Sequence, residues 1–561
     1  RSALPAGDRD EPVEHRELLQ GSLTDGSNLT TMATIAPPRR PAVTLPERVT
    51  GNVRVLVPLA FGLIVAVSIL LRTRAFGVGF WIDEGLSVGI ANRDLAAIPG
   101  ALRLDGSPPL YYVLLHFWIA VFGTSEGATH ALSLLFAVLT IPAAAWAAHG
   151  LFGQRAAWIA AILAATNPFL TQYAQETRMY ALVVLLATVA CGAFGRAFAL
   201  TGTEAEPSPG LRRRWAAVFG VALAALFYTH NWSLFFAAGC GAAWLGLLAV
   251  GGGARRDLLR DGLVGFGVAV LLWVPWLPTF AFQLQHTGAP WSEAPGLSDL
   301  LGVPGRLLGA VAQLGLLLAA GAGVLALLDP RGGRLSARGR ATATMLSIGV
   351  GAVLAAWLAS QVSPAWAPRY LAVALPPLLL FAVAGLAHSA RLGLVGVIVV
   401  AVIWASDGAP SEKSNVREVA QSIAPSLHPG DIVVSTQPEQ IPVLAYYLPP
   451  GLRYATLWGP VADTGVTDWR DGVQRLRGTN AQQDLAPLMN RMHSGQRLVL
   501  VEPVVNDIAR WLAPWTELVR VRSTEWRQFV SNDPRFTATA LRPSTFTTHS
   551  NQLRAMVLVK D

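Results

Sequence analysis

Two adjacent carboxylates, Asp83 and Glu84, occur in the stretch GFWIDEGLS at 79–87, shortly after an apolar run at 53–71. Ionisable side chains at membrane depth are rare and usually functional. As solvated residues just outside the bilayer the pair would need no function. In a partly apolar cleft, one of them could serve as a general base or a metal ligand. Neighbouring side chains point in different directions, so we expect one acid to react while the other supports the fold.

Two further segments carry an arginine close to an aromatic residue. QETRMY contains Glu176, Arg178 and Tyr180, and PRYLAVALPP contains Arg369 and Tyr370. Arginine binds phosphate through two parallel hydrogen bonds. The alternative is an interfacial arginine whose head group reaches water. Topology alone disfavours arginine outside the cytosol, which favours the interpretation as a phosphate-binding site.

Isolated polar residues lie in the same set of loops. Asp105 begins the stretch DGSPP, and His230 lies in FYTHNW. A lone histidine is more often a hydrogen-bonded structural residue than a ligand. We expect Asp105 and His230, together with His286 and Glu293, to gather with the acids and arginines around one cavity on one side of a membrane.

Apolar helices must position these residues. The chain is 52% hydrophobic and 14% charged, against roughly 25% charged residues in ordinary soluble domains. A helix needs about 20 mainly apolar residues to span a bilayer. The composition therefore predicts a mainly α polytopic membrane protein. Its candidate spans are 53–71, 128–149, 155–171, 177–200, 214–229, 233–251, 262–282, 303–328, 341–361, 370–388 and 391–406.

Basic clusters orient these spans. GLRRRW at 210–215, ARRDLLR at 254–260 and PRGGRLSARGR at 330–340 all fall in the cytosol if the positive-inside rule holds. The N-terminus is then cytosolic, and the loops with the polar residues are external, as is the C-terminal part. The clusters also account for the net charge of +8, so no nucleic-acid partner is expected.

The apolar segment at 107–123 does not fit this alternation. After its proline pair it offers about 15 residues, which is short for a crossing, and a crossing here would invert every basic loop. We predict a juxtamembrane or re-entrant helix within one external loop, 72–127, which also contains Asp83, Glu84 and Asp105.

The two ends of the chain differ from the apolar middle. Residues 1–52 are polar, which predicts a disordered cytosolic tail, and 53–406 would be the membrane domain. After 407, strand-like runs such as DIVVST and RLVLVE alternate with helical ones. This pattern predicts a soluble external α/β domain at 407–561 with a mainly parallel sheet.

The polar motifs and their order resemble the GT-C superfamily of membrane glycosyltransferases. The stretches FWIDEGLS, DGSPPLYYVLLHFWIAVFG, the region from LFGQRAAW to QETRMYALVVLLA, and PRYLAVALPPLLL carry the resemblance, which spans roughly 53–406. The likeness is to the bacterial branch related to protein O-mannosyltransferases and to the lipid A aminoarabinose transferase. One departure is visible, because Ser107 stands where many relatives have a histidine in the motif Asp-Gly-His-Pro-Pro.

The resemblance implies an inverting glycosyltransferase that takes a sugar from a polyprenyl-phosphate donor. Asp83 corresponds to the catalytic base, and Glu84 to the second position of the acidic motif. Arg178 and Arg369 match positions near the donor phosphate, and Glu176 lies in the matching helix-end motif. Tyr180, Asp105, His230 and Tyr370 are further candidates for substrate binding.

Several features of the reaction stay open at this point. The sugar would be mannose or a pentose such as arabinofuranose. The acceptor would be a hydroxyl group of a cell-envelope glycan, lipid or protein outside the bacterial cytoplasmic membrane. No cofactor is required, but Asp83 and Glu84 could hold a divalent cation, Mg²⁺ or Mn²⁺, through hard oxygen ligands.

Two alternatives use the same sequence features differently. One is a transporter or flippase for lipid-linked glycans, but such proteins commonly contain internal repeats with paired interrupted helices, and none is evident here. The other is a non-catalytic membrane scaffold whose external domain binds wall polymer.

Overall fold

The computed structural model describes residues 47–201, 208–330, 335–408, 413–542 and 551–561. By its internal contacts the chain divides into Arg1–Val57 and Pro58–Asp561. The apolar helices from Pro58 onward and the C-terminal α/β region belong to the second unit. The predicted disordered tail lies outside the described residues, except that 47–52 form the start of helix α1. The predicted domain boundary at 406/407 stays a prediction.

An apolar helix overlaps each of the eleven predicted spans. Among the described residues, six helices are long and apolar enough to cross a membrane: Val55–Arg72, Glu126–Phe152, Tyr180–Ala197, Ser233–Val250, Arg255–His286 and Ala337–Val362. The number of crossings stays a prediction. The helices in the spans are α1 (Glu47–Arg72), α5 (Glu126–Phe152), α6 (Gln154–Thr166), α8 (Tyr180–Ala197), α9 (Pro209–Phe227), α10 (Ser233–Val250), α11 (Arg255–Trp273), α15 (Ala310–Leu328), α16 (Ala337–Val362), α17 (Leu375–His388) and α18 (Ala390–Ser406).

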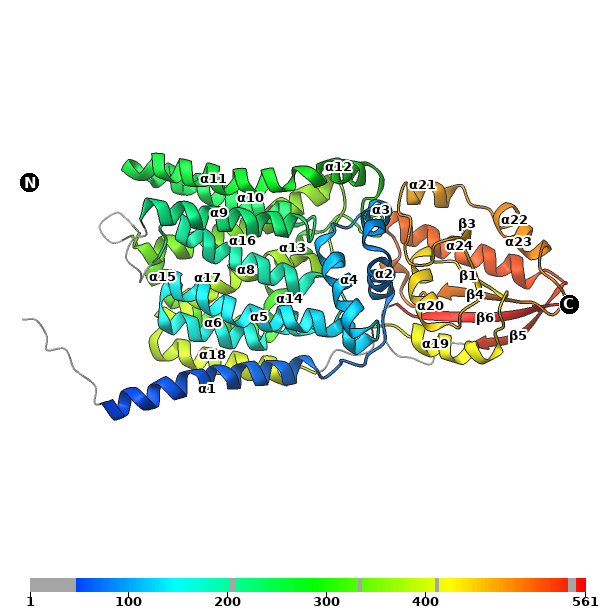
Figure 1. The fold of residues 1–561 in the computed structure, drawn as a ribbon, viewed down its shortest axis with the longest axis horizontal. Helices are drawn as coiled ribbons and strands as arrows, with labels where there is room; N and C mark the ends of the chain where they lie inside the picture. Colours follow the sequence, from blue (N-terminus) through cyan, green and yellow to red (C-terminus); the bar gives the residue numbers. More distant parts are fainter. Residues whose placement is uncertain (1–46, 202–207, 331–334, 409–412, 543–550) are drawn as a thin grey trace, which may run out of the picture. The chain divides into compact units, whose positions relative to one another are not determined.

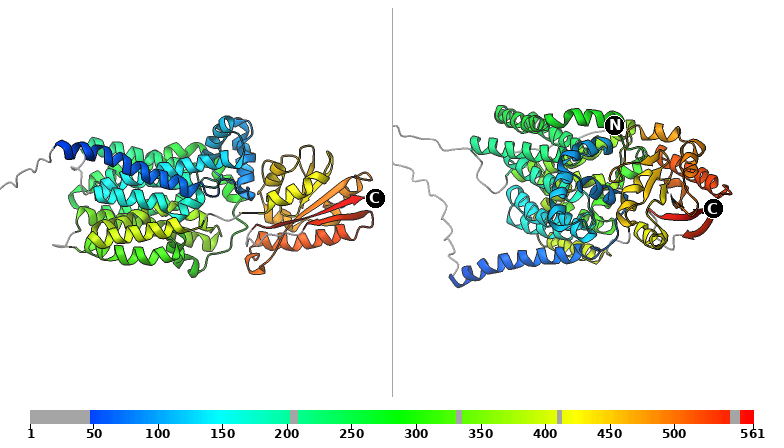
Figure 2. Two further views of the ribbon diagram at one scale, coloured as in Figure 1. Left: turned by 90° about the horizontal axis from the view of Figure 1, so that it is seen from below. Right: turned by 45° about the vertical axis from the view of Figure 1, so that its right-hand side comes forward.

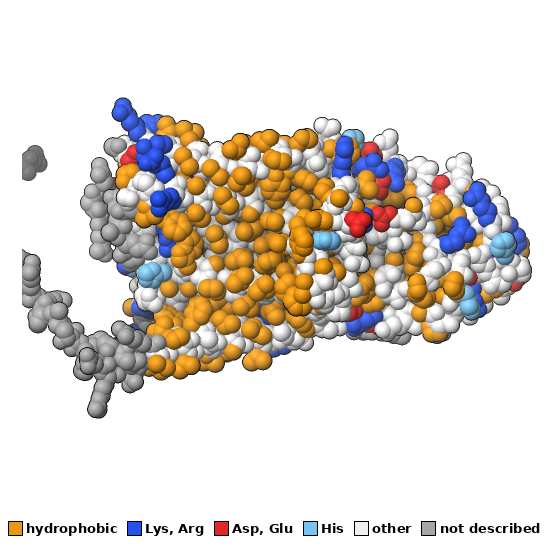
Figure 3. Space-filling view, viewed as in Figure 1, with side chains coloured by type: hydrophobic (Ala, Val, Ile, Leu, Met, Phe, Trp, Pro, Cys, Tyr) orange, Lys and Arg blue, Asp and Glu red, His pale blue; other side chains and the backbone are white. Residues whose placement is uncertain are grey.

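These helices run side by side, and their outer surface is apolar. Figures 1 and 2 show the helices roughly parallel to one another. On the face drawn in Figure 3, hydrophobic side chains cover the helices, while charged side chains gather toward the helix ends. Exposed leucine and valine side chains are stable in hydrocarbon but not in water. The surface therefore fits a membrane environment.

Shorter helices connect the apolar ones, and four predicted spans contain more than one helical element: 155–171, 262–282, 303–328 and 370–388. The segment 303–328 forms two helices, because Gly309 has φ of 74°. The shorter elements are α7 (Pro168–Tyr173), η2 (Gly252–Ala254), η3 (Val274–Trp276), α12 (Leu277–His286), α13 (Leu297–Leu301), α14 (Val303–Leu308) and η5 (Pro368–Val373).

The loop predicted at 72–127 contains four short helical elements: α2 (Ile82–Ala91), η1 (Leu95–Ala97), α3 (Ile98–Asp105) and α4 (Leu110–Phe122). Helix α4 has 13 residues, so its length is about 20 Å, less than the roughly 30 Å of a hydrocarbon core. This length agrees with the prediction that the helix at 107–123 does not cross the membrane. In Figure 1, α2, α3 and α4 lie between the ends of the long helices and the C-terminal region.

The C-terminal region is a six-stranded sheet with the order β3-β2-β1-β4-β6-β5. Its strands are β1 (Ile432–Ser435), β2 (Arg453–Thr456), β3 (Gly459–Val461), β4 (Arg497–Pro503), β5 (Phe536–Arg542) and β6 (Leu553–Lys560). The helical elements are α19 (Val416–Ile423), η6 (Ala424–Ser426), η7 (Pro438–Gln440), α20 (Ile441–Tyr447), α21 (Gly472–Arg477), α22 (Ala481–Asp484), α23 (Ala486–Asn490), η8 (Ile508–Arg510) and α24 (Pro514–Ser531).

The prediction of a mainly parallel sheet is wrong. Strand β1 is parallel to both β2 and β4, and these three strands are the ones that the alternating pattern indicated. The pairs β2–β3, β4–β6 and β5–β6 are antiparallel. Only two residues separate β2 from β3, which is too short for the crossover that a parallel neighbour needs.

The two faces of this sheet pack on different cores. Val433 and Val499 belong to the core that is continuous with the apolar helices. Ile432 and Leu498, one residue earlier in each strand, pack in a second core with Trp515 of α24. In Figure 2, α19 and α20 lie on one side of the sheet and α24 on the other. Successive side chains of a strand point to opposite faces of the sheet. One face therefore packs on the core of the apolar helices, and the other packs against α24.

A candidate active site between the helix ends and the C-terminal region

A cavity of about 730 Å³ lies where the helix ends meet the C-terminal region. The helical part contributes residues from α2, from the turns after α3 and α9, and from α12, α16 and η5. The C-terminal region contributes residues around η7, Trp469 and η8. We call it the large cavity. Of the predicted site residues, its lining includes Asp83, Asp105, Arg178, His230, Arg369 and Tyr370.

Asp83 lies between two arginines at the wall of the large cavity. Its Oδ2 atom is 3.8 Å from Nε of Arg178 and 3.6 Å from a terminal nitrogen of Arg369. Within the described residues, this oxygen and the Nε atoms of both arginines are buried and make no hydrogen bond. The side chain of Asp83 is 17% exposed. The carboxylate is thus held by charge, and its Oδ2 atom has no hydrogen-bond partner.

Arg178 is fixed against α2 from the turn that precedes α8. It donates hydrogen bonds to Oγ of Ser87 at 3.1 Å and to the hydroxyl of Tyr112 at 3.2 Å. Arg369 enters from η5, with its guanidinium 5.4 Å from the ring centroid of Trp81. Segments far apart in sequence therefore bring the two arginines to one carboxylate.

Glu84 points into a different environment. Its Oε1 accepts hydrogen bonds from the backbone N–H of Thr177 at 2.8 Å and from Lys413 at 2.8 Å, and lies 2.7 Å from Nε2 of His130. Burial alone would raise the pKa of Glu84, but the charge of Lys413 and the contact with His130 outweigh it and lower the pKa to about 2. Glu84 is fully buried and lies outside the lining of both cavities described here.

The acid pair does not fit a shared metal ion. Among the described residues, no three His, Cys, Asp or Glu side chains are grouped so as to hold one. Consecutive helical residues are about 100° apart around the axis, and each carboxylate already faces cationic partners. A divalent cation at Asp83 and Glu84 would have to displace these partners.

A second cavity of about 590 Å³ lies on the other side of Trp81 and Arg369, which line both cavities. We call it the small cavity. Its charged lining consists of the cations Arg74, Arg369 and Lys413 and the acids Glu176 and Asp407. Its apolar lining includes Leu71, Pro168 and Trp404. The small cavity thus combines positive charge with an apolar wall at the ends of α1 and α18.

Glu176 is a predicted site residue whose carboxyl pKa lies near neutral pH. Burial raises the pKa of its carboxyl to about 7, aided by the charge of Glu84 and opposed by Lys413. Its Oε2 atom makes no hydrogen bond within the described residues. A carboxyl with this pKa changes its charge in the physiological range.

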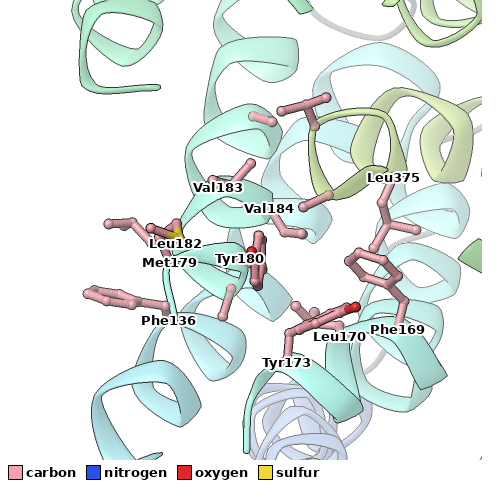
Figure 4. Packing of buried hydrophobic residues seen from close by; sticks show 14 of the residues in the cluster. Phe136, Phe169, Leu170, Tyr173, Met179, Tyr180, Leu182, Val183, Val184 and Leu375 are labelled. Atoms are coloured by element: carbon pink, nitrogen blue, oxygen red, sulfur yellow. The ribbon is translucent and has the colours of Figure 1, made fainter. Parts of the chain in front are cut away.

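The aromatic residues of the site form a cluster beneath it. The ring of Tyr180 lies 4.9 Å from that of Tyr173 and 5.8 Å from that of His230, and His230 lies 4.7 Å from Tyr370. Figure 4 shows Tyr173 and Tyr180 packed near Leu375 of α17. Burial and the nearby arginines lower the pKa of His230 to about 3, so its imidazole is neutral. Tyr180 lies outside the lining of both cavities.

Asp105 is the last residue of α3 and lines the large cavity. The next residue, Gly106, has φ of 97°, and a Cβ there would lie 2.7 Å from Oγ1 of Thr287. Burial raises the pKa of Asp105. Its Oδ2 atom makes no hydrogen bond within the described residues. By contrast, His286 pairs with Asp471, and Glu293 is exposed; neither lines the cavity.

The C-terminal region packs directly on α2. A Cβ on Gly85 would lie 2.5–2.8 Å from atoms of Val443, and a Cβ on Gly89 would lie 2.5 Å from the carbonyl oxygen of Gly465. Glycines four residues apart share one face of a helix, and this face lies against the C-terminal region. The helix that carries Asp83 is therefore supported from outside the apolar bundle.

Sequence reasoning missed the contributions of Trp81, His130, Lys413 and Glu439. Lys413 is one of only two lysines in the chain, and that rarity was a usable signal. The others carry no local signal, because their role depends on contacts with residues 46 or more positions away.

Taken together, the fold is a set of apolar helices, several of them long enough to cross a membrane, with a cavity where their ends meet an α/β region. No protein-family model and no curated protein matches the sequence. Among solved structures, ArnT from Cupriavidus metallidurans bound to undecaprenyl phosphate matches with a TM-score of 0.56 at 14% identity. The match covers 88% of this chain and 97% of that one.

Two other glycosyltransferases have the same fold. The oligosaccharyltransferase of Archaeoglobus fulgidus in its apo form matches with a TM-score of 0.52 at 11% identity, over 82% of this chain and 72% of that one. The mycobacterial arabinofuranosyltransferase AftD matches with a TM-score of 0.50 at 17% identity, over 89% of this chain and 41% of that one. All three are GT-C membrane glycosyltransferases, so the predicted resemblance to that superfamily is confirmed at the level of the fold.

Proposed function

We propose that the protein is an inverting membrane glycosyltransferase that uses a polyprenyl-phosphate sugar as donor. The observation that carries the proposal is the partly exposed carboxylate of Asp83, which makes ion pairs with Arg178 and Arg369 at the wall of the large cavity. The transferred sugar is mannose or a pentose such as arabinofuranose. The acceptor is a hydroxyl group of the bacterial cell envelope, on the outer side of the cytoplasmic membrane.

In the proposed reaction, Asp83 acts as the general base. The acceptor oxygen attacks the anomeric carbon of the donor sugar and gives its proton to the carboxylate of Asp83. The bond from that carbon to the phosphate oxygen breaks on the opposite side, so the configuration inverts. The bond electrons leave with the polyprenyl phosphate, whose added negative charge is stabilised by nearby cations.

The small cavity suits the donor phosphate and the start of its prenyl chain. ArnT is named as bound to undecaprenyl phosphate, and here Arg74, Arg369 and Lys413 line a cavity with an apolar wall. Arg369 also lines the large cavity and lies 3.6 Å from Asp83. A sugar that extends from the phosphate past Arg369 and Trp81 would reach the base.

The remaining candidates have supporting roles in this proposal. Arg178 positions Asp83, because its own hydrogen bonds tie it to Ser87 of α2 and to Tyr112 of α4. Glu84 holds α2 to the turn at Thr177 and to Lys413, and acts as a positioning residue. His230, Tyr180 and Tyr370 form the aromatic floor.

The test is a transfer assay with the full chain in lipid nanodiscs. Synthetic polyprenyl-phosphate mannose and polyprenyl-phosphate arabinofuranose are each incubated with a bacterial envelope extract. Transfer is followed by mass spectrometry of the released polyprenyl phosphate, and the anomeric configuration of the product by NMR. We expect release with one donor and an inverted product. Asp83→Asn should lower the rate by about 10³-fold, as loss of a general base does, while donor affinity stays within about twofold.

Three results would overturn the proposal. Unchanged transfer by the Asp83→Asn variant would remove Asp83 as the base. A product with retained configuration would contradict the single displacement. Movement of the intact lipid-linked sugar across a liposome membrane, without cleavage of either donor, would favour the transporter alternative.

A further inference from the structure

Part of the wall of the large cavity belongs to the C-terminal region. Gln437, Glu439, Trp469 and Asn506 line this wall. The helical part alone therefore makes only one side of the cavity. A ligand that fills the large cavity must contact the C-terminal region as well as Asp83.

Side chains that line this cavity, from the helical part and from the C-terminal region, carry buried polar atoms without hydrogen-bond partners. Within the described residues, these atoms are four oxygens and four N–H groups: Oδ2 of Asp83, Oδ2 of Asp105, Oε1 of Gln283, Oε2 of Glu439, Nε1 of Trp81, Nε1 of Trp291, Nε of Arg178 and Nε of Arg369. Buried polar atoms in native proteins nearly always have a partner, and an exception needs a specific explanation. A bound ligand that both donates and accepts hydrogen bonds would satisfy both kinds of group.

Glu439 is the most constrained of the four residues that carry these oxygens. The residue is 6% exposed, and its Oε1 accepts hydrogen bonds from Gln437 at 2.9 Å and from the indole N–H of Trp515 at 3.0 Å. These bonds fix the carboxyl and leave Oε2 without a partner. Burial raises the pKa of Glu439, and the charge of Asp83 adds to the shift.

This pattern selects the chemistry of the ligand. A phosphate diester accepts hydrogen bonds but donates none, so it would leave the four oxygens without partners, and a prenyl chain neither donates nor accepts. A peptide backbone brings as many carbonyl acceptors as N–H donors. A hydroxyl group can donate to a carboxylate or accept from a carboxylic acid, so it suits Asp105 and Glu439 in either protonation state. A polyhydroxylated ligand fits best.

Tryptophans beside these acceptors complete the site. Trp291 and Trp469 line the large cavity, and their ring centroids lie 4.6 Å apart. Trp469 packs in turn against Trp515, the residue that holds Glu439, at 4.8 Å. An indole face is apolar while its N–H is polar, which matches the C–H face and the hydroxyl edge of a sugar ring.

We propose that the C-terminal region binds the carbohydrate part of the acceptor, with Glu439 as the central ligand-binding residue and Trp291 and Trp469 as a stacking surface. This deepens the proposed function, on which it rests, by naming the acceptor as a glycan. The acceptor sugar lies between Glu439 and Asp83, so that one of its hydroxyl groups reaches the base.

Binding of defined glycans, measured without catalysis, tests the proposal. The full chain in nanodiscs is titrated with mannotriose, with a linear arabinofuranosyl trisaccharide and with a serine-rich hexapeptide, by saturation-transfer NMR and calorimetry. We expect saturable binding of at least one trisaccharide. Glu439→Gln replaces an acceptor by a donor of the same shape and should weaken that binding by about tenfold. The exposed Glu517→Gln is the matched control and should change it by less than about twofold.

A second variant protects the test against misfolding. Asn506 is exposed and lines the cavity, so Asn506→Ala should fold and weaken trisaccharide binding by about threefold. The proposal is overturned if neither trisaccharide binds, if both cavity variants bind like the wild type, or if the hexapeptide is the ligand whose binding Glu439→Gln removes. Transfer without trisaccharide binding would remove only this inference. Trisaccharide binding without transfer of either sugar would remove only the proposed function.

Discussion

The two faces of helix α2 carry adjacent carboxylates with opposite environments. Asp83 is partly exposed, lies 3.6 and 3.8 Å from two arginines and keeps one oxygen without a hydrogen bond. Glu84 is fully buried, and its partners are a lysine, a histidine and a backbone N–H. Residue type therefore does not distinguish an acid available for reaction from a structural one. The number of hydrogen bonds that each carboxylate makes does distinguish them.

The largest contrast between the two faces should appear in stability. Glu84→Gln removes the charge that Lys413 faces in a buried network, and breaking a buried ion pair costs about 3–5 kcal/mol. We expect the free energy of unfolding to fall by about 3 kcal/mol for Glu84→Gln and by less than about 1 kcal/mol for Asp83→Asn. Unfolding in mixed detergent, followed by tryptophan fluorescence, measures both. Equal losses for the two variants would erase the distinction between the faces.

The two arginines beside Asp83 should differ in kinetics, because only Arg369 lines both cavities. Arg369→Ala should weaken donor binding and lower kcat/KM for the donor by about 100-fold, as loss of a charge-stabilising donor does. Arg178→Ala should lower kcat by a similar factor and leave donor affinity within about threefold. Donor titrations and initial rates separate the two effects. If both variants weaken donor binding equally, Arg178 also contacts the phosphate.

A smaller effect on the free energy of unfolding is expected at the glycine face of α2, where Gly100 of the neighbouring helix α3 serves as a control. Gly85→Ala places a Cβ within 2.5–2.8 Å of Val443, whereas a Cβ on Gly100 of α3 meets nothing within 4 Å. Overpacking of this kind costs about 1–3 kcal/mol, so we expect Gly85→Ala to lower the free energy of unfolding by about 2 kcal/mol. Gly100→Ala should leave it unchanged or raise it slightly. A stable Gly85→Ala protein would mean that α2 and the C-terminal region are not in tight contact.

The smallest effect should be a pH dependence of donor binding in the small cavity. Because the pKa of Glu176 is raised to about 7, its neutral form is favoured in the folded protein, and this contribution to stability declines as pH rises from about 4.5 through 7. Above pH 7, the ionised carboxylate adds negative charge beside the cations. We expect donor affinity to fall about threefold to fivefold between pH 6 and 8.

The variant Glu176→Gln isolates this titration. The donor is a phosphodiester, whose charge is constant over this range, so the pH dependence should disappear in the variant. Equilibrium binding of the donor at both pH values measures it. Two results would contradict a role for Glu176 in donor binding. One is a wild-type donor affinity that does not change between pH 6 and 8. The other is a Glu176→Gln variant whose donor affinity depends on pH as the wild type's does.

The sequence predicted the helical elements well, because a run of about 20 apolar residues has few alternatives to a spanning helix. It also predicted the loop helix at 107–123 and the runs that form β1, β2 and β4. It failed for the antiparallel strands β3, β5 and β6. The pairing partners of a strand depend on how the chain returns, and the alternation of residue types does not encode that path.

For the candidate site, the sequence by itself determined which residue types were expected on one side of the membrane. Asp83, Arg178 and Arg369 were identified from their chemistry and from the resemblance, and the structure brings them together. Contacts in the folded chain, and not the sequence pattern, place Lys413 and His130 on Glu84, make Trp81 and Arg369 line both cavities, and bring Glu439 into the lining of the cavity that contains Asp83. The physical reason is that hydrogen-bond saturation and cavity walls arise from contacts between distant segments, which no local pattern specifies.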